Sequence, residues 1–482
     1  MAAEESKAAK KVPVLPWMRA PVDIDIVDEC PLDLLPCLDP RLEEALKKME
    51  FESLFKVQVA VWHETIGPGA FERDICVNSP TGTGKTLAYA LPIVQKLSTR
   101  KIKCLRALVV LPTRDLAAQV KKVFDDLAPA VGLHVGLAVG QSSIADEISQ
   151  LVKGPKFGMA ASFDPEDLQM EIQTNVDILV ATPGRLMDHI NTTNGFSLEH
   201  LCYLVVDETD RLLREAYQSW LPTVIKLSAS NDQAIFANEE IAPSMVGSLC
   251  TLRRHGVERG FKGKTYPRLA KIVLSATLTQ DPSKLSQFDL HHPLLLTSGH
   301  ERYKLPEGLK SYIVIYEPKL KSSYLISLLQ ELRGEKCIVF VSSKKPPRKL
   351  NSLLESLVDL PFKICGYSSL QHQSVRRKTL KAFIEGKIDV LVASDVLARG
   401  IDVVGVRNVI NYDKPAHTKT YIHRAGRTAR AGHAGCCFTL LRKEEVRRFK
   451  KILQKADNHS FDMHTVPADS IESLRSTCSS AQ

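Results

Sequence analysis

Residues 74–97 read DICVNSPTGTGKTLAYALPIVQKL, which is an apolar run, a glycine-containing loop and a helix-length segment in succession. The run Asp74–Asn78 has the length of a buried strand, and Leu87–Leu97 has the length and composition of a helix. In the loop between them, Ser79–Thr86 (SPTGTGKT), backbone N–H groups can converge on phosphate oxygens at the start of the helix. The stretch therefore predicts a nucleotide-phosphate site on an α/β sheet.

The positions of this loop have distinct chemical roles. Gly82 and Gly84 let the backbone approach phosphate closely, Lys85 places a positive charge on the β- and γ-phosphates, and the Thr86 hydroxyl can ligate Mg²⁺. A glycine-rich turn without a ligand is the alternative interpretation. The predicted cofactor site contains every residue of the loop: Ser79, Pro80, Thr81, Gly82, Thr83, Gly84, Lys85 and Thr86.

Short apolar runs alternate with helix-length segments through most of the chain, in two blocks. Such runs, without alternating polar residues, are typical of parallel strands that are covered on both faces. We therefore predict an α/β fold. The runs are Ala107–Leu111, Ile178–Ala181, Tyr203–Val206 and Lys271–Leu274 in the first block, and Cys337–Val341, Val390–Ala393 and Val409–Tyr412 in the second.

A stretch without helical periodicity, Leu294–Gly308, separates the two blocks and is interpreted as a linker between domains of similar size. Two further aperiodic stretches, about 153–175 and about 228–266, are predicted insertions in the first domain. The predicted boundaries are an N-terminal extension over 1–38, a first domain over 39–298, a linker over 299–310, a second domain over 311–457 and a flexible tail over 458–482.

The composition is that of a globular protein with a modest basic excess. The chain has 482 residues, of which 44% are hydrophobic and 25% charged, and a formal net charge of +9. This excess suits a polyanionic partner without identifying one. No apolar run approaches the roughly 18–20 residues of a membrane span, and the first residues do not resemble a secretory signal. We therefore expect no membrane partner and a place on the cytosolic or nuclear side.

Two local features favour structural interpretations over functional ones. The 11 cysteines are scattered without a C-x-x-C pair, which predicts reduced thiols rather than a zinc site or disulfides. The basic helix Glu444–Lys455 could contact RNA or a partner, but we interpret it as the solvated face of a terminal helix.

An acidic turn, Asp207-Glu208-Thr209-Asp210, follows the strand-like run Leu204–Val206. Acidic residues at the carboxyl end of a parallel strand lie at the crevice where such sheets bind ligands. Together with a phosphate loop, Asp207 is expected to hold Mg²⁺ through water, and Glu208 to orient and deprotonate the attacking water. A solvated acidic turn is the alternative.

These two motifs resemble the Walker A and B segments of the DEAD-box RNA helicases, and other family signatures follow in order from about Phe51 to Arg430. The resemblance implies two tandem RecA-like domains, each a mostly parallel sheet covered by helices on both faces, and an RNA-stimulated ATPase that uses ATP and Mg²⁺. The further signatures are Pro112–Gln119, Gly140-Gln141, Thr182–Leu186, Ser275-Ala276-Thr277, Ile338–Ser343, Gln373–Arg376, Ala393–Asp402, Val409–Pro415 and His423–Arg430.

The same resemblance implies further roles in the ATPase. Arg427 and Arg430 would act as arginine fingers, and Asp402 would contact the ribose. Because the fingers and the phosphate loop lie on opposite sides of the linker, the active site is expected to be complete only when the domains close. The implied catalytic residues are Lys85, Asp207, Glu208, Arg427 and Arg430, and those that couple hydrolysis to RNA work are Asp210, Ser275 and Thr277.

The RNA contacts implied by the resemblance are arginines, hydroxyls and backbone amides, which suit phosphate and 2′-OH groups rather than bases. They are Thr113, Arg114, Gly140, Thr182, Gly184 and Arg185 in the first domain and Arg376, Ser394 and Arg399 in the second. For adenine, Gln58 can pair with N6 and N7, and Phe51 can stack on the base. Leu54 and Phe55 depart from the family pattern between them, so a buried phenylalanine beside an exposed glutamine remains the alternative.

Two other functions would suit the same scaffold. One is an ATP-gated RNA clamp or assembly scaffold with little unwinding, and the other is a DNA helicase. The presence of Lys85, Glu208 and both finger arginines argues against the clamp. The long insertion after Asp210 resembles the subgroup linked to large-ribosomal-subunit assembly. It implies pre-ribosomal partners, a role in rRNA processing and a nuclear or nucleolar location, with the cytoplasm as the alternative, for a motor that we expect to be monomeric.

Overall fold

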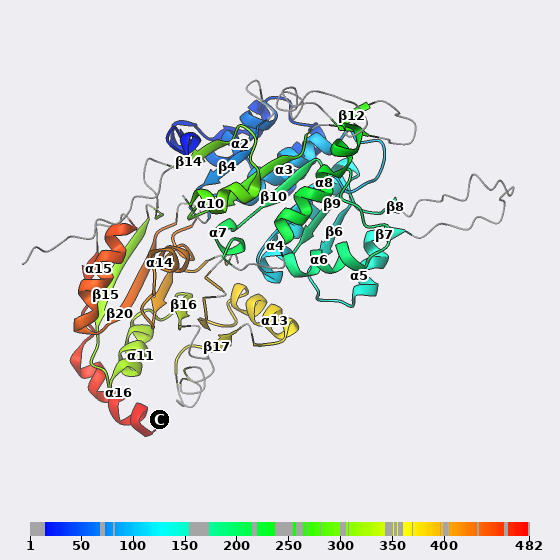
Figure 1. Ribbon diagram of the computed structural model, residues 1–482. Helices are drawn as coiled ribbons and strands as arrows, with labels where there is room; N and C mark the ends of the chain where they lie inside the picture. Colours follow the sequence, from blue (N-terminus) through cyan, green and yellow to red (C-terminus); the bar gives the residue numbers. More distant parts are fainter. Residues whose placement is uncertain are drawn as a thin grey trace, which may run out of the picture. The chain divides into compact units, whose positions relative to one another are not determined.

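The chain forms two compact α/β units (Figure 1). Unit 1 comprises Met1–Asn78 and Thr86–Thr297, and unit 2 comprises Ser79–Lys85 and Ser298–Gln482. The computed structural model describes residues 15–67, 73–80, 82–153, 173–214, 219–236, 254–256, 264–266, 268–279, 281–298, 305–306, 308–342, 350, 354, 360–368, 370–395, 397–398, 403, 405–430, 433–456 and 461–480.

Unit 1 is built on an eight-stranded sheet with the order β1-β14-β4-β13-β10-β5-β9-β6. All neighbouring strands in it are parallel. The carboxyl ends of its strands therefore lie along one edge, where the predicted motifs follow them. The strands are β1 (Val22–Asp23), β4 (Ile75–Asn78), β5 (Ala107–Val110), β6 (Val135–Ala138), β9 (Ile178–Ala181), β10 (Tyr203–Val206), β13 (Ala270–Ser275) and β14 (Leu294–Thr297).

Helices cover both faces of this sheet, because successive side chains of a strand point to opposite sides. In β10, Val205 packs into one hydrophobic cluster, while Leu204 and Val206 pack into the other. The first cluster includes side chains of α1 (Pro40–Lys48), α2 (Lys56–Thr65), α3 (Lys85–Leu97) and α4 (Arg114–Leu127). The second includes side chains of α5 (Ile144–Leu151), α6 (Pro183–Thr192), α7 (Thr209–Leu212), α8 (Trp220–Phe236) and α10 (Pro282–Leu285).

Unit 2 repeats this design on a seven-stranded sheet with the order β17-β18-β16-β19-β20-β15-β21, again parallel throughout. Its strands are β15 (Leu309–Ile315), β16 (Cys337–Phe340), β17 (Ile364–Tyr367), β18 (Val390–Ala393), β19 (Asn408–Asn411), β20 (Gly435–Leu441) and β21 (Asp462–Met463). Its helices are α11 (Lys321–Glu331), α13 (Gln373–Ile384), α14 (Thr418–Ala425), α15 (Val446–Lys455) and α16 (Ala468–Ser480).

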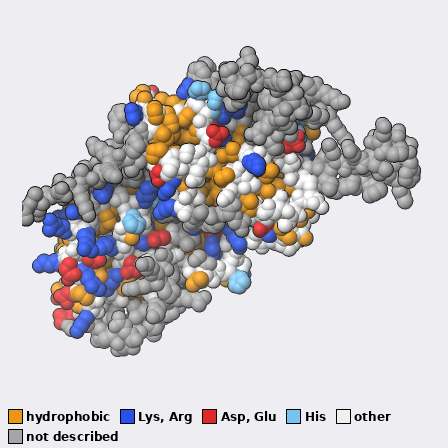
Figure 2. All heavy atoms as spheres, viewed as in Figure 1, with side chains coloured by type: hydrophobic (Ala, Val, Ile, Leu, Met, Phe, Trp, Pro, Cys, Tyr) orange, Lys and Arg blue, Asp and Glu red, His pale blue; other side chains and the backbone are white. Residues whose placement is uncertain are grey.

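The helix α15 is strongly amphipathic. Phe449 and Leu453 are buried in the core of unit 2. Figure 2 shows Lys and Arg side chains gathered over the part of unit 2 that contains α15. The exposed cations of this helix are Arg447, Arg448, Lys450, Lys451 and Lys455. The predicted helix with an outward basic face is therefore present.

The structure corrects the interpretation of Leu294–Gly308 as a linker throughout. Its first residues, Leu294–Thr297, form β14, which pairs with β1 and β4 inside the sheet of unit 1. The apolar run is buried there, and a strand needs no helical period. Two short hairpins lie in the predicted insertions, β7 (Val152–Lys153) with β8 (Gln173–Thr174) and β11 (Arg254–Gly256) with β12 (Lys264–Tyr266). The remainder of those two stretches lies largely outside the described residues.

Residues that precede the predicted first domain also belong to unit 1. The strand β1 extends the sheet, and β2 (Cys30–Pro31) pairs with β3 (Ser53–Leu54). Leu32 and Leu35 are buried in the same cluster as α2. The Trp62 indole N–H donates a hydrogen bond to the carbonyl of Pro36 at 3.0 Å. This packing orders the segment immediately upstream of the predicted adenine residues.

Nine cysteines among the described residues are free thiols. Burial raises the pKa of the Cys337 and Cys437 thiols to about 12, which makes both unreactive. Within the described part of the chain, no helix has both the length and the apolar character of a membrane span.

Candidate nucleotide and RNA site

The phosphate loop joins β4 to α3 and has a backbone suited to anions. Gly82 and Gly84 have φ of +89° and +82°, in the left-handed region that favours glycine. The Lys85 ammonium lies against the loop, where it donates hydrogen bonds to the carbonyls of Ser79 at 2.7 Å and Pro80 at 2.6 Å. Because the loop leads into the N-terminus of α3, its amides and the helix dipole both favour a negatively charged group.

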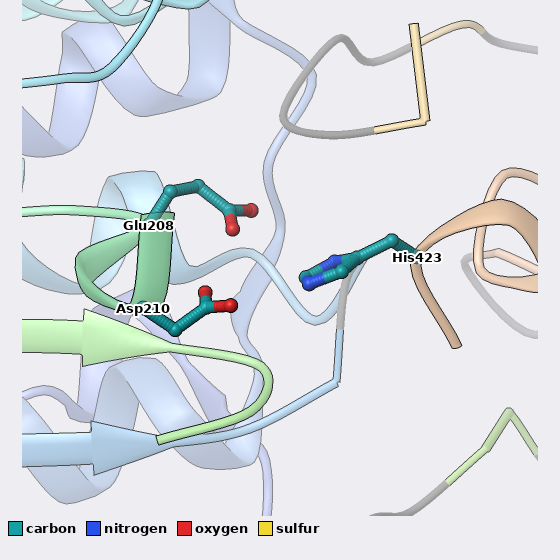
Figure 3. A group of neighbouring side chains, drawn as sticks. All are labelled: Glu208, Asp210 and His423. Atoms are coloured by element: carbon teal, nitrogen blue, oxygen red, sulfur yellow. The ribbon is translucent and has the colours of Figure 1, made fainter. Parts of the chain in front are cut away.

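The acidic turn lies at the carboxyl end of β10. Glu208 has a φ of +52°, a left-handed conformation that costs a residue with a Cβ about 1–3 kcal/mol. Figure 3 shows the Glu208 and Asp210 side chains extending from this turn. Glu208 is 4% exposed, and its carboxylate Oε2 accepts no hydrogen bond from the described residues. A buried, unsatisfied carboxylate oxygen on a strained turn is a candidate general base.

Two predicted Mg²⁺ ligands are joined by a buried phenol. The Tyr89 hydroxyl, on α3, hydrogen-bonds Asp207 Oδ2 at 3.4 Å and also the Thr86 side chain. Burial, and then the Asp207 charge, raise the pKa of Tyr89 well above its ordinary value, so the phenol stays protonated. A hydroxyl and a carboxylate held together are the hard oxygen ligands that Mg²⁺ prefers, so these residues fit that ion.

The acidic turn is tied to the end of the neighbouring strand, β13. The Thr209 hydroxyl hydrogen-bonds the carbonyls of Val206 and Leu274, both at 2.9 Å. One Asp210 carboxylate oxygen accepts a hydrogen bond from the Ser275 hydroxyl at 3.2 Å. The three predicted coupling residues are thus brought together, because the same Ser275 hydroxyl accepts the N–H of Thr277 at 3.0 Å.

The predicted RNA-contacting residues of unit 1 lie where strands lead into helices. Thr113 precedes α4, and its hydroxyl accepts the Leu116 N–H at 3.4 Å. Thr182 precedes α6, whose first turn contains Gly184 and Arg185. The N-termini of both helices therefore lie at the carboxyl edge of the sheet, where their dipoles favour phosphate.

Three of these residues converge. Gly140, after β6, has a φ of +67°. A Cβ placed on Gly140 would lie 3.5 Å from Arg114 Nη2 and 3.6 Å from Arg185 Nε. Two arginines therefore lie beside a backbone amide, an arrangement suited to a nucleic-acid backbone.

The predicted adenine residues have structural contacts of their own. The Gln58 Oε1 accepts the backbone N–H of Phe55 at 2.8 Å, which caps α2, and Gln58 is 2% exposed. Phe51 packs against the large core cluster of unit 1. The alternative interpretation, in which the glutamine is exposed, does not hold, and adenine recognition by this pair stays a prediction.

Unit 2 presents its predicted residues at the carboxyl edge of its own sheet. Arg376 lies over the Tyr367 ring, 5.5 Å from its centroid, and Ser394 follows the neighbouring strand β18. The Ser394 hydroxyl is buried without a hydrogen-bond partner among the described residues. Arg427 and Arg430 donate from Nε to carbonyls one helical turn earlier, at 3.2 and 2.8 Å. Thr81, Arg399 and Asp402 lie outside the described residues.

Comparison with known proteins identifies the family. Residues 55–285 match the DEAD/DEAH box helicase family, and residues 320–432 match the helicase conserved C-terminal domain. The chain is 65% identical, over 99% of its length, to "DEAD-box ATP-dependent RNA helicase 1" of Oryza sativa subsp. japonica, of which it covers 92%. The chain belongs to the DEAD-box ATP-dependent RNA helicase family.

Other relatives agree with this DEAD-box membership. The chain is 37% identical to "ATP-dependent RNA helicase DDX51" of Homo sapiens, over 97% of this chain and 71% of that protein. The fold is similar to that of the DEAD-box helicase Mss116 bound to ssRNA and UDP-BeF, with a TM-score of 0.72 and 25% identity, covering 95% of this chain and 84% of that one. The predicted two-domain RecA-like fold is confirmed, and so are RNA-stimulated ATPase and ATP-dependent RNA helicase activity, with RNA as partner and ATP as cofactor.

Several contacts of this DEAD-box chain have no counterpart in the sequence predictions. Tyr89 and Glu147 read in sequence as ordinary positions of amphipathic helices, yet both carry buried polar groups. Arg424 belongs to a recognised signature but not to the predicted finger pair. It is 1% exposed and donates hydrogen bonds to Asp395 at 2.6 Å and to the Asp413 carbonyl at 2.7 Å. These roles depend on the groups that the folded chain places around each side chain, and the sequence alone does not show those groups.

Proposed function

We propose that ATP hydrolysis in this helicase is performed by the loop after β4 and the turn after β10. Lys85 neutralises phosphate charge, and Glu208 orients and deprotonates the attacking water. Thr86 and Asp207 hold Mg²⁺, which supplies positive charge to the phosphate oxygens when bound. The observation that carries this assignment is the buried Glu208 Oε2 without a hydrogen-bond partner among the described residues, on a left-handed residue beside Asp207.

Arg427 and Arg430 of unit 2 complete the proposed catalytic set. Each guanidinium would stabilise the charge of the transferring phosphoryl group, a contribution worth about 10³–10⁵ in rate in related phosphoryl transfer. Because Thr86, Asp207 and Glu208 belong to unit 1 and both arginines to unit 2, ATP would have to draw the two units together before hydrolysis. That requirement links the nucleotide state of the site to the affinity for RNA.

The proposed RNA face of unit 1 is the group formed by Arg114, Gly140 and Arg185, with the N-termini of α4 and α6. These groups contact phosphate and 2′-OH rather than base edges, so binding should be independent of sequence. Closure of unit 2, through Arg376 and Ser394, would bend the bound strand and destabilise a short duplex.

Comparing ATP hydrolysis stimulated by RNA and by DNA of equal length and sequence tests this assignment. RNA should stimulate hydrolysis strongly and DNA weakly, because the 2′-OH distinguishes the two. Equal stimulation would count against an RNA-specific face and favour a DNA helicase on the same scaffold.

We further propose that the biological substrate is a precursor of the large ribosomal subunit, and that the protein acts in the nucleolus. The support is the long insertion after Asp210, which resembles that of the subgroup linked to this assembly. Sedimentation of cell extracts tests the proposal: the protein should migrate with pre-ribosomal particles. Exclusive association with translating ribosomes would refute it.

A further inference from the structure

A buried carboxylate, Glu147 on α5, lies behind the proposed RNA face. It is 3% exposed. Its Oε1 accepts hydrogen bonds from the Gly140 N–H at 3.0 Å and the Ser142 hydroxyl at 3.3 Å. Its Oε2 accepts the Arg185 Nε–H at 2.8 Å and hydrogen-bonds His189 Nε2 at 3.0 Å. Groups from the loop after β6 and from α6 therefore meet on one side chain of α5.

We infer that Glu147 is a positioning residue for RNA binding, which holds the Gly140 amide and the Arg185 guanidinium in one fixed geometry. This inference rests on the proposed RNA face. The Gly140 amide and the Arg185 guanidinium are hydrogen-bond donors with or without Glu147. Their contacts with Glu147 fix the direction in which each of them points. The inference therefore concerns affinity for RNA rather than the chemistry of ATP.

The electrostatics of the cluster favour a permanently charged Glu147. Burial raises the pKa of this carboxyl, but hydrogen bonds from His189 and Arg185 more than offset that effect and leave the pKa below its ordinary value. His189 is itself buried, and its Nδ1 hydrogen-bonds the Thr193 hydroxyl at 2.9 Å. Because His189 is fixed at both nitrogens, it fixes the carboxylate in turn.

The contacts of Arg185 explain how its direction is set. Nε donates to Glu147, and Nη2 donates to the carbonyl of Ser142 at 2.7 Å. The planar guanidinium is thus held along one edge by a carboxylate and a backbone carbonyl, the geometry that gives arginine its directional hydrogen bonds. The same pair of contacts closes the Gly140–Ser142 loop against α6.

A second buried carboxylate in unit 1 provides a matched control. Asp177 is fully buried, and its Oδ2 accepts the His134 N–H at 2.9 Å and Arg100 Nη2 at 2.8 Å. It directly precedes β9, whereas the proposed RNA residue Thr182 directly follows that strand. The two clusters therefore lie at opposite ends of one strand, and Asp177 is remote from the RNA face.

The experiment compares the full-length variants Glu147→Gln and Asp177→Asn. For each, the RNA concentration that gives half-maximal stimulation of ATP hydrolysis is measured, together with the rate at saturating RNA and the unfolding temperature. Glutamine keeps the shape of Glu147 but turns one acceptor oxygen into a donor that opposes the donors facing it. We expect half-saturation to require about tenfold more RNA, with a much smaller change in the saturated rate. Asp177→Asn should lower the unfolding temperature without moving RNA half-saturation.

Salt dependence separates positioning from general destabilisation. Loss of one arginine–phosphate contact should reduce the slope of log affinity against log salt by about 0.7 for a single strand. A merely structural defect would leave that slope unchanged. Glu147→Gln with wild-type half-saturation, or with a shift no larger than that of Asp177→Asn, would overturn the inference.

Two further variants cover the remaining outcomes. Arg185→Ala tests the proposed RNA face itself. If this variant leaves RNA half-saturation unchanged, the proposed RNA face is wrong. If Arg185→Ala shifts half-saturation but Glu147→Gln does not, only the positioning role of Glu147 is refuted. If Glu147→Gln does not fold, the pair His189→Leu and His189→Gln replaces it. Glutamine can still donate to Glu147, so the leucine variant should need more RNA for half-saturation. Equal values for the two would contradict the inference.

Discussion

The Ser275 hydroxyl donates a hydrogen bond to a carboxylate oxygen of Asp210 at 3.2 Å, and so connects the ends of two neighbouring strands of unit 1. The other Asp210 carboxylate oxygen accepts from Arg214 at 2.6 Å. Asp210 therefore has a partner at each carboxylate oxygen, and it lies two residues after Glu208. We therefore expect a movement of the acidic turn to be transmitted through Ser275 to the segment that follows β13.

Removal of this connection should separate hydrolysis from unwinding. In Ser275→Ala, Lys85 and Glu208 are untouched, so we expect RNA-stimulated ATP hydrolysis within about threefold of wild type. Unwinding of a short duplex should fall by about tenfold or more, because the hydroxyl that links the two strands is missing. Parallel ATPase and strand-displacement assays measure both, and proportional losses in the two would show that Ser275 has no coupling role.

A stability prediction concerns Arg424 in unit 2. Its guanidinium is buried against Asp395, the Asn411 side chain and the Asp413 carbonyl. Arg424→Met leaves these acceptors without a cation, and should cost about 3–5 kcal/mol of unfolding free energy. Hydrogen exchange of β18 and β19 amides reports the loss. The exposed control Arg447→Met on α15 should change this free energy by no more than about 0.5 kcal/mol, and a similar loss there would contradict the account.

The pH dependence of stability should reflect Glu147. The pKa of the Glu147 carboxyl is lowered from 4.5 in the folded protein. The folded chain therefore binds fewer protons at this site than the unfolded chain does. The stabilisation is then fully present above pH 4.5 and is lost as pH falls through the folded pKa. The stability difference between wild type and Glu147→Gln should be constant from pH 7 to 5 and shrink below 4.5. A stability difference that grows as the pH falls would mean that folding raises the pKa of Glu147 rather than lowering it, and would refute a charged Glu147 in the folded protein.

The buried strands could be predicted from sequence almost residue by residue. Ile178–Ala181, Tyr203–Val206 and Val390–Ala393 are strands with those same bounds, because a strand covered on both faces must be apolar throughout. The opposite case is Val22–Asp23, a strand too short to carry a pattern. Its place beside β14 is set by tertiary packing. The same holds for β14 itself, the strand within Leu294–Gly308.

The candidate site shows the same division. Residues with distinctive chemistry in a fixed spacing, such as Lys85 and Glu208, could be named from the sequence. Glu147 and Tyr89 could not, because a carboxylate or phenol on a helix usually faces solvent or fills a core. Their roles depend on which groups the fold places around them, and local sequence does not encode that.

Glu208 is proposed to activate water in this RNA-stimulated ATPase, and the variant Glu208→Gln removes that function alone. The measurement is the rate of ATP hydrolysis at saturating RNA, with ATP-dependent RNA binding followed in the same preparation. We expect hydrolysis to fall by at least about 100-fold, in the range expected for loss of general-base catalysis, while RNA binding in the presence of ATP persists. Hydrolysis at the wild-type rate would contradict it.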